Sequence, residues 1–141
     1  MIAITSKSRY AVRALSELAR AGGVPGGAPV PIGELARRRD IPVQFLEQLF
    51  ATLRRAGMLT SQRGVKGGYA FAREPADVTV LEVVQALDGT FEDGGGENGR
   101  PEGGGVWAEA VGGLRERLGA VTIADIVQRE ARAAGAQMYH I

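Results

Sequence analysis

Three segments decide the fold of this chain: Ile32-Gly-Glu-Leu-Ala-Arg-Arg-Arg39, Val43-Gln-Phe-Leu-Glu-Gln-Leu-Phe50 and Arg63-Gly-Val-Lys-Gly-Gly-Tyr69. Apolar residues recur at helical spacing in the first two segments, which predicts two short helices. The third segment predicts a tight turn between two strands, because its glycines permit positive φ. Two helices followed by a basic hairpin have the layout of a winged helix-turn-helix, which lays one helix into a DNA major groove. We therefore expect a mainly α protein with a small β-hairpin wing that binds double-stranded DNA.

The charge of the chain is divided unevenly. The net charge is only +1, but residues 1–73 hold twelve Lys and Arg against four Asp and Glu, whereas residues 74–141 hold five against twelve. Such asymmetry indicates that the N-terminal part faces phosphates. Chance clustering of solvated charges is the alternative.

Further helices are predicted on both sides of the three segments. Thr79-Val-Leu-Glu82 and Thr122-Ile-Ala-Asp125 have the pattern of N-terminal helix caps. The expected helices cover about residues 5–21, 32–39, 42–57, 79–87, 106–119 and 122–134, and the expected strands cover residues 58–63 and 69–73.

The chain is expected to divide at a glycine-rich loop. Residues 89–105 contain eight glycines and several acids with almost nothing to pack, which is typical of a flexible segment. The helices that follow lack a core of their own, so we expect them to pack against a second copy of the chain; folding back on the same subunit is the alternative. The expected organisation is a winged helix-turn-helix at 1–88, a flexible loop at 89–105, dimerisation helices at 106–135 and a tail at 136–141. The expected dimer contacts are Trp107, Val111, Leu114, Leu118 and Ile126.

Composition excludes several classes of function. The chain has no cysteine and a single histidine, His140, so disulfides, thiolate metal sites and thiol redox sensing are excluded. We do not expect an enzyme, because the chain has no cysteine nucleophile, only one histidine and no carboxylate pair on apolar elements. The N-terminus lacks the apolar core of a signal peptide and no run approaches a membrane span, so a cytoplasmic protein is expected.

Four motifs carry a resemblance to a known family. They are Tyr10-Ala-Val-Arg-Ala14, Phe45-Leu-Glu-Gln-Leu49, Leu53-Arg-Arg-Ala-Gly57 and Arg63-Gly-x-x-Gly-Gly-Tyr69. Together they resemble the Rrf2 family of bacterial winged-helix transcription regulators, the family of IscR, NsrR and CymR. The resemblance covers nearly the whole chain, since the capped helix at Thr122 also fits.

The resemblance implies which residues contact DNA. Its base contacts fall on Gln44, Glu47 and Gln48 of the second motif helix and on Arg63 of the wing. Glutamine can pair with adenine, glutamate can accept from the cytosine amino group, and arginine is drawn into narrow A·T-rich minor grooves. Glu47 could instead be a solvated charge, and residues 37–39 are expected to be exposed arginines or weak backbone contacts. The expected phosphate contacts are Ser6, Lys7, Arg9, Tyr10, Arg54, Arg55 and Lys66.

The loop departs from the iron–sulfur members of the family, which carry three cysteines there. A cluster needs thiolate or imidazole ligands, so we expect no iron–sulfur cluster and no other cofactor. Among members without a cluster, the chain looks closest to the cysteine-metabolism repressor CymR. The last four residues of this chain, Met138, Tyr139, His140 and Ile141, are similar to that repressor's C-terminal tail.

This likeness implies a partner and a regulon. The tail would bind cysteine synthase (O-acetylserine sulfhydrylase), with the terminal carboxylate in the substrate site, and the homodimer would repress genes of cysteine metabolism. Three alternatives remain: a tail that is disordered or packed on the dimer, direct sensing of a small molecule between the fifth and sixth helices, and a winged helix that binds only protein.

Overall fold

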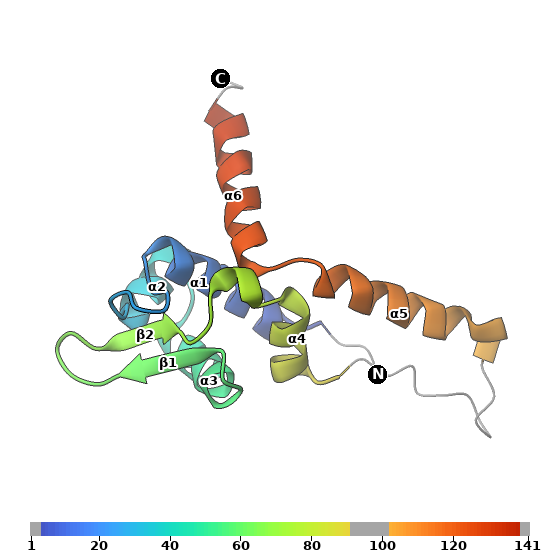
Figure 1. The fold of residues 1–141 in the computed structure, drawn as a ribbon, viewed down its shortest axis with the longest axis horizontal. Helices are drawn as coiled ribbons and strands as arrows, with labels where there is room; N and C mark the ends of the chain where they lie inside the picture. The colour runs from blue at the N-terminus through green and yellow to red at the C-terminus, as the bar shows by residue number, and fades with distance from the viewer. Residues whose placement is uncertain (1–3, 91–101, 139–141) are drawn as a thin grey trace.

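The computed structural model describes residues 4–90 and 102–138. These residues form six α-helices and a two-stranded antiparallel hairpin, which extends from one side of the helical body (Figure 1). The expected mainly α fold with a β-hairpin wing is confirmed. The elements are α1 (Ser6–Arg20), α2 (Ile32–Arg39), α3 (Val43–Arg55), β1 (Leu59–Gln62), β2 (Gly68–Phe71), a 3-10 turn (Pro75–Asp77), α4 (Val80–Asp88), a second turn (Glu102–Gly105), α5 (Val106–Gly119) and α6 (Ile123–Met138).

Side-chain caps fix where several helices begin. The Thr79 hydroxyl accepts from the Glu82 amide at 3.1 Å, which starts α4. At α6 the cap is reciprocal: the Asp125 amide donates to the Thr122 hydroxyl at 3.1 Å and the Thr122 amide donates to the Asp125 carboxylate at 2.9 Å. Pro42, expected as the first residue of α3, instead precedes the helix in an extended conformation.

The main core lies between α1 and α3 and is closed by the hairpin. Leu15 and Leu18 of α1 and Phe50 and Leu53 of α3 are fully buried in it. The loop before α2 pairs with β2 of the hairpin through an isolated antiparallel bridge, in which the Val30 and Tyr69 backbones exchange two hydrogen bonds of 2.8 Å. Gly68 is required at this point: its φ is +150°, and a Cβ there would lie 2.3 Å from the Val30 backbone.

The two C-terminal helices also make contacts within their own subunit. Ile123, at the start of α6, is fully buried in the main core, and its amide donates to the Val78 carbonyl at 2.9 Å. Val111 of α5 is buried against Val84 of α4. The apolar residues of both helices are therefore covered in part by their own subunit, which was the alternative to packing only on a second copy.

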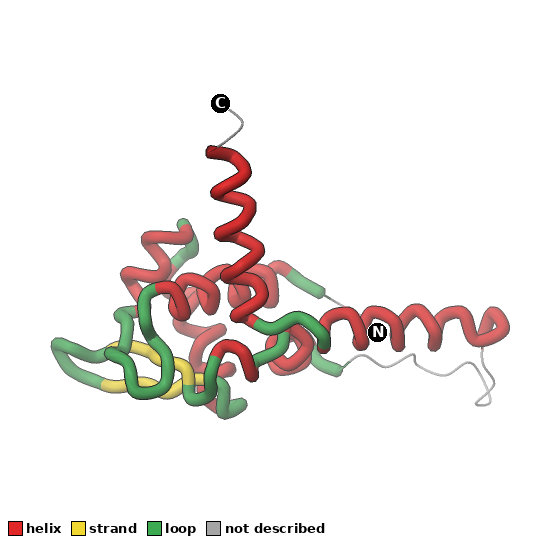
Figure 2. The backbone as a smooth tube through the Cα atoms, turned by 45° about the horizontal axis from the view of Figure 1, so that its top comes forward, coloured by secondary structure: helices red, strands yellow, loops and turns green. Residues whose placement is uncertain are grey.

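Beyond these contacts the two helices leave the body. Figures 1 and 2 show α5 and the C-terminal half of α6 pointing away from it in different directions. Residues 131–134 are exposed. α6 continues to Met138, four residues beyond its expected end, so the expected tail at 136–141 begins inside a helix. Residues 139–141 and most of the expected flexible loop lie outside the described residues.

Candidate nucleic-acid interface

One side of α3 presents three polar side chains. Gln44, Glu47 and Gln48 are exposed, and their side chains form no hydrogen bond or ion pair with any residue that the structure describes. The opposite side of α3 is buried, with Leu46 and Leu49 in the core. The helix is thus held rigidly from behind while this recognition face, Gln44, Glu47 and Gln48, stays available to a partner.

The N-terminal part of α1 forms a hollow beside α3. Ser6, Arg9, Tyr10 and Arg13 line it, which brings three of the expected phosphate contacts together. The Tyr10 ring packs edge-on against Phe45 with centroids 5.6 Å apart, and the Arg13 guanidinium lies 5.3 Å from the Tyr10 ring centre. Tyr10 is therefore partly a packing residue. Arg13, which sequence reasoning missed, also donates to the Arg39 carbonyl at 2.7 Å.

The wing carries two basic side chains at and near its tip. Arg63 and Lys66 are exposed and have no hydrogen bond or ion pair within residues 4–90 and 102–138. Arg54, expected at phosphates, donates to the Ser61 hydroxyl at 3.1 Å and so ties α3 to β1. Tyr69 packs against Phe50 behind the wing, with ring centroids 5.2 Å apart.

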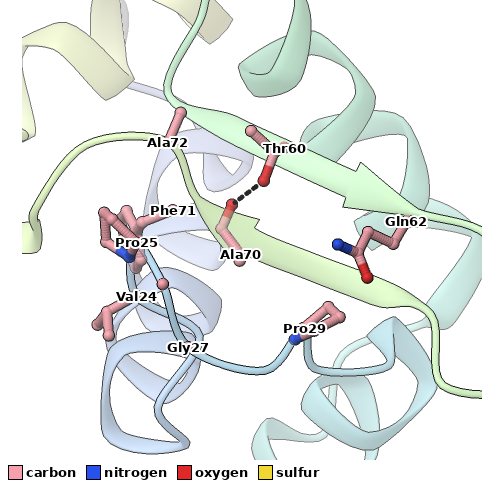
Figure 3. Close-up of a pocket in the computed structure, with 10 residues that line it drawn as sticks. Val24, Pro25, Gly27, Pro29, Thr60, Gln62, Ala70, Phe71 and Ala72 are labelled. Carbon is pink, nitrogen blue, oxygen red and sulfur yellow. Dashed lines mark hydrogen bonds between the residues drawn. The ribbon is translucent and has the colours of Figure 1, made fainter.

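The loop after α1 supports the wing from its other side. Figure 3 shows the hollow between this loop and the two strands, with the Thr60 hydroxyl donating to the Ala70 carbonyl. The Phe71 amide donates to the Gly23 carbonyl at 2.7 Å, which joins β2 to the loop. The lining of this hollow contains no charged residue, so it does not extend the basic surface.

Arg39 is not the exposed arginine that the sequence suggests. Its side chain is 14% exposed and donates to Glu17 of α1 at 2.8 Å and to Glu130 of α6 at 2.7 Å. The Ser16 hydroxyl also donates to Glu130. We call Glu17, Arg39 and Glu130 the inter-helix network, because it joins α1, α2 and α6. Arg38 pairs with Glu17 and Glu34, so of the three arginines only Arg37 is exposed and without an ion pair among the described residues.

The network sets the ionisation of its carboxyl groups. The hydrogen bond from Arg39 lowers the pKa of Glu130; burial opposes this, and the bond from Ser16 adds to it. Burial raises the pKa of Glu17, but hydrogen bonds from Arg39 and Arg38 outweigh it and hold that pKa below its usual value. Both groups are therefore carboxylates at neutral pH, as the pairing with Arg39 requires.

The end of α4 caps the start of α1. The Asp88 carboxylate accepts from the Thr5 hydroxyl at 2.6 Å, the Thr5 amide at 3.0 Å and the Ser8 hydroxyl at 2.6 Å. Burial raises the pKa of Asp88, but the bonds from Ser8 and Thr5 outweigh it and lower the pKa below its usual value. The carboxylate thus fixes the helix end that carries Ser6 and Arg9, and it does so across 83 residues of sequence.

The expected dimer contacts separate into exposed and covered residues. Trp107 is 60% exposed, and Ile126 is half-buried. Val111 is 7% exposed against Val84, and Leu114 and Leu118 pack on the same small cluster. Val111 therefore has little surface left for a partner, because α4 already covers it.

The described residues lack a cluster of metal ligands and a membrane-spanning helix. No group of three or more His, Cys, Asp and Glu side chains is placed to hold a metal ion there. None of the helices described has both the length and the apolar character needed to cross a bilayer.

Comparison with known proteins identifies the family. Residues 4–129 match the family model "Rrf2: Iron-dependent Transcriptional regulator". The HTH-type transcriptional regulator ORF2 of Azotobacter vinelandii is 33% identical over 133 residues, which covers 89% of this chain and 79% of that protein. IscR of Vibrio atlanticus is 41% identical over 85 residues, which covers 60% of this chain and 47% of IscR. This chain therefore spans about half the length of that IscR.

Solved structures agree with the sequence matches. CymR, the global cysteine regulator of B. subtilis, superposes with a TM-score of 0.80 at 28% identity, covering 92% of this chain and 98% of CymR. IscR of T. potens superposes with a TM-score of 0.74 at 32% identity, covering 94% of this chain and 90% of that one. The chain, with its two-helix motif and basic wing, belongs to the Rrf2 family of HTH transcriptional regulators.

Proposed function

We propose that this chain regulates transcription as a homodimer bound to an imperfectly palindromic DNA operator. The observation that carries the proposal is the recognition face of α3, whose polar side chains have no partner among the described residues. Gln44, Glu47 and Gln48 read base edges in the major groove, and Arg63 enters the adjacent minor groove. Phosphate contacts by Ser6, Lys7, Arg9, Tyr10, Arg54, Arg55 and Lys66 set the register.

The test is selection of bound sequences from random duplex DNA with the full chain. We expect an imperfect palindrome with half-sites about one helical turn apart, ~34 Å. Sedimentation of the free and bound protein measures the oligomeric state. Arg73→Ala is the control, because Arg73 forms an ion pair with Glu82 and lies outside the proposed contacts. A monomer that binds DNA tightly, or selection that enriches no sequence, would contradict the proposal.

A second, more specific function is repression of cysteine-metabolism genes under the control of cysteine synthase. The superposition on CymR, which covers 98% of that chain, favours it. In this proposal residues 138–141 bind the enzyme, and the Ile141 carboxylate occupies its substrate-carboxylate site. α6 would carry this tail outward, since its C-terminal half projects from the body (Figure 2). O-acetylserine would then compete with the tail.

Calorimetric titration of the two purified proteins tests the partnership, with and without O-acetylserine. Deleting Ile141 should weaken binding by roughly 1–3 kcal/mol or more, because the enzyme's carboxylate donors lose their partner. Equal binding by the full and the deleted chain, or binding by neither, would remove cysteine synthase from the proposal and leave operator binding untouched.

The proposed regulator works without an iron–sulfur cluster, although its family is described as iron-dependent. The donor set does not fit such a cluster, since the chain has no cysteine and one histidine. The purified protein should be colourless, and its operator affinity should not change with iron chelators or nitric oxide. A visible absorption band that tracks with DNA binding would contradict this.

A further inference from the structure

A hollow lies where α4, α5 and α6 meet. Its volume is about 410 Å³, within the range of small-molecule sites. Val80, Leu118, Val121 and Ile126 give it half-buried apolar walls. Such a site holds the apolar body of a ligand, and its polar groups decide the class of ligand.

Two arginines complete the lining. Arg117 of α5 and Arg129 of α6 are exposed, and their guanidinium groups make no hydrogen bond or ion pair with any residue in the described ranges. Asp125 lies one turn before Arg129 on the same helix, and Glu130, which follows Arg129 in sequence, is already paired with Arg39. The Asp125 carboxylate already accepts the Thr122 amide at 2.9 Å, and Arg129 acts on it only through the longer-range field. Donors for an external anion are therefore free.

We propose that this hollow binds a small organic carboxylate with an apolar body. Guanidinium groups recognise carboxylates through paired hydrogen bonds. The apolar walls of the hollow favour a ligand with a branched or aromatic group of about five to ten carbons. Arg129 adjoins Glu130, which is bonded to Arg39 of α2. A ligand here would thus touch α6 next to the contact that joins it to the DNA-binding helices. That regulatory meaning rests on the proposed operator binding; the binding site itself does not.

The experiment is a titration of the full chain, without DNA, followed by amide chemical shifts in NMR. The probes are 4-methylpentanoate and its neutral counterpart 4-methylpentan-1-ol. We expect the carboxylate to bind with a Kd on the order of 1 mM, to shift the amides of Leu118, Val121 and Ile126, and to bind about tenfold more tightly than the alcohol. Because no DNA is present, failure of operator binding would leave this result unchanged.

Matched variants test the two arginines. Arg117→Gln and Arg129→Gln should each weaken binding of 4-methylpentanoate by about fivefold or more, since each removes a charged donor. Arg132→Gln is the control: it removes the same charge from an exposed position of α6 that does not line the hollow. Equal binding of the acid and the alcohol, an equal effect of Arg132→Gln, or no binding because a second copy covers the hollow would each overturn the proposal.

Discussion

The inter-helix network and the wing each depend on an arginine, and the two arginines have opposite surroundings. Arg39 is 14% exposed and contacts two carboxylates, whereas Arg63 is exposed and contacts none within the part of the chain that the structure describes. Removing a buried charge leaves its partners uncompensated, while removing an exposed one affects mainly what binds from outside. In the proposed regulator, positive charge in the N-terminal half thus serves two purposes: it holds three helices together and it attracts the DNA phosphates. Mutation should separate them.

The largest effect should come from Arg39→Ala. It leaves Glu17 and Glu130 as half-buried carboxylates without their main donor, so the free energy of unfolding should fall by about 2–3 kcal/mol. Urea denaturation followed by circular dichroism measures the change. Arg37→Ala, an exposed neighbour on the same helix, should change stability by no more than about 0.5 kcal/mol. Equal losses of stability in the two variants would contradict the view that Arg39 stabilises the fold through its ion pairs.

Arg63→Ala should act on DNA binding alone. Operator affinity should fall by about 1–3 kcal/mol, while unfolding in urea should stay within about 0.5 kcal/mol of the parent. Fluorescence anisotropy over a range of salt concentrations measures it. Lys66→Ala should instead flatten the salt dependence by about one unit, because it removes one phosphate contact. If Arg63→Ala left affinity unchanged at every salt concentration, the wing would not contact DNA.

Gln48→Ala should affect base discrimination and not overall affinity, because an uncharged side chain in the major groove contacts base edges. Discrimination at one base pair of each half-site should fall by about 1–2 kcal/mol, with little change in salt dependence. Competition with single-base variants of the operator measures this. Gln128→Ala, on the exposed side of α6, is the matched control. A uniform loss of affinity for all sequences would place Gln48 among the positioning contacts.

The smallest expected effect is on the pH dependence of stability at acid pH. The folded-state pKa values of Glu17 and Glu130 are lowered, so their contribution to stability is fully present above their unfolded pKa near 4.5. It is lost as the pH falls from there through the folded pKa values, because the unfolded chain then binds more protons. Glu130→Gln should therefore flatten the loss of urea stability below about pH 4.5. An acid-induced loss of urea stability as steep in Glu130→Gln as in the parent would contradict this.

Local pattern was sufficient to predict much of the fold. Helical spacing predicted α2 and α5 with the ends that the structure shows, and the threonine caps predicted the starts of α4 and α6. Each of these features depends on residues within one or two turns of one another. The recognition face was predictable for the same reason, since exposure on one side of α3 follows from burial of the other.

Contacts between distant segments could not be predicted in this way. Arg39 and Glu130 are 91 residues apart, and Thr5 and Asp88 are 83 residues apart. Periodicity shows that Arg39 and Glu130 lie on helices, but only the docking of α6 on α1 brings them together. Val111 illustrates the same limit: its place on an apolar stripe does not tell whether α4 or a second copy covers it.

The burial of Ile123 also bears on the order in which the protein is made. Every proposed DNA contact lies before residue 67, while the side chain that completes the core between α1 and α3 comes more than fifty positions later. On the ribosome, all of the proposed DNA-contacting residues are therefore synthesised before Ile123, which completes the hydrophobic core. Because domains normally fold as units during synthesis, we expect this winged helix to reach its native stability only once its last helix has left the ribosome. A fragment that stops after α4 should be a poor substitute for the whole chain, and translation itself would then delay the moment at which a new molecule can occupy an operator.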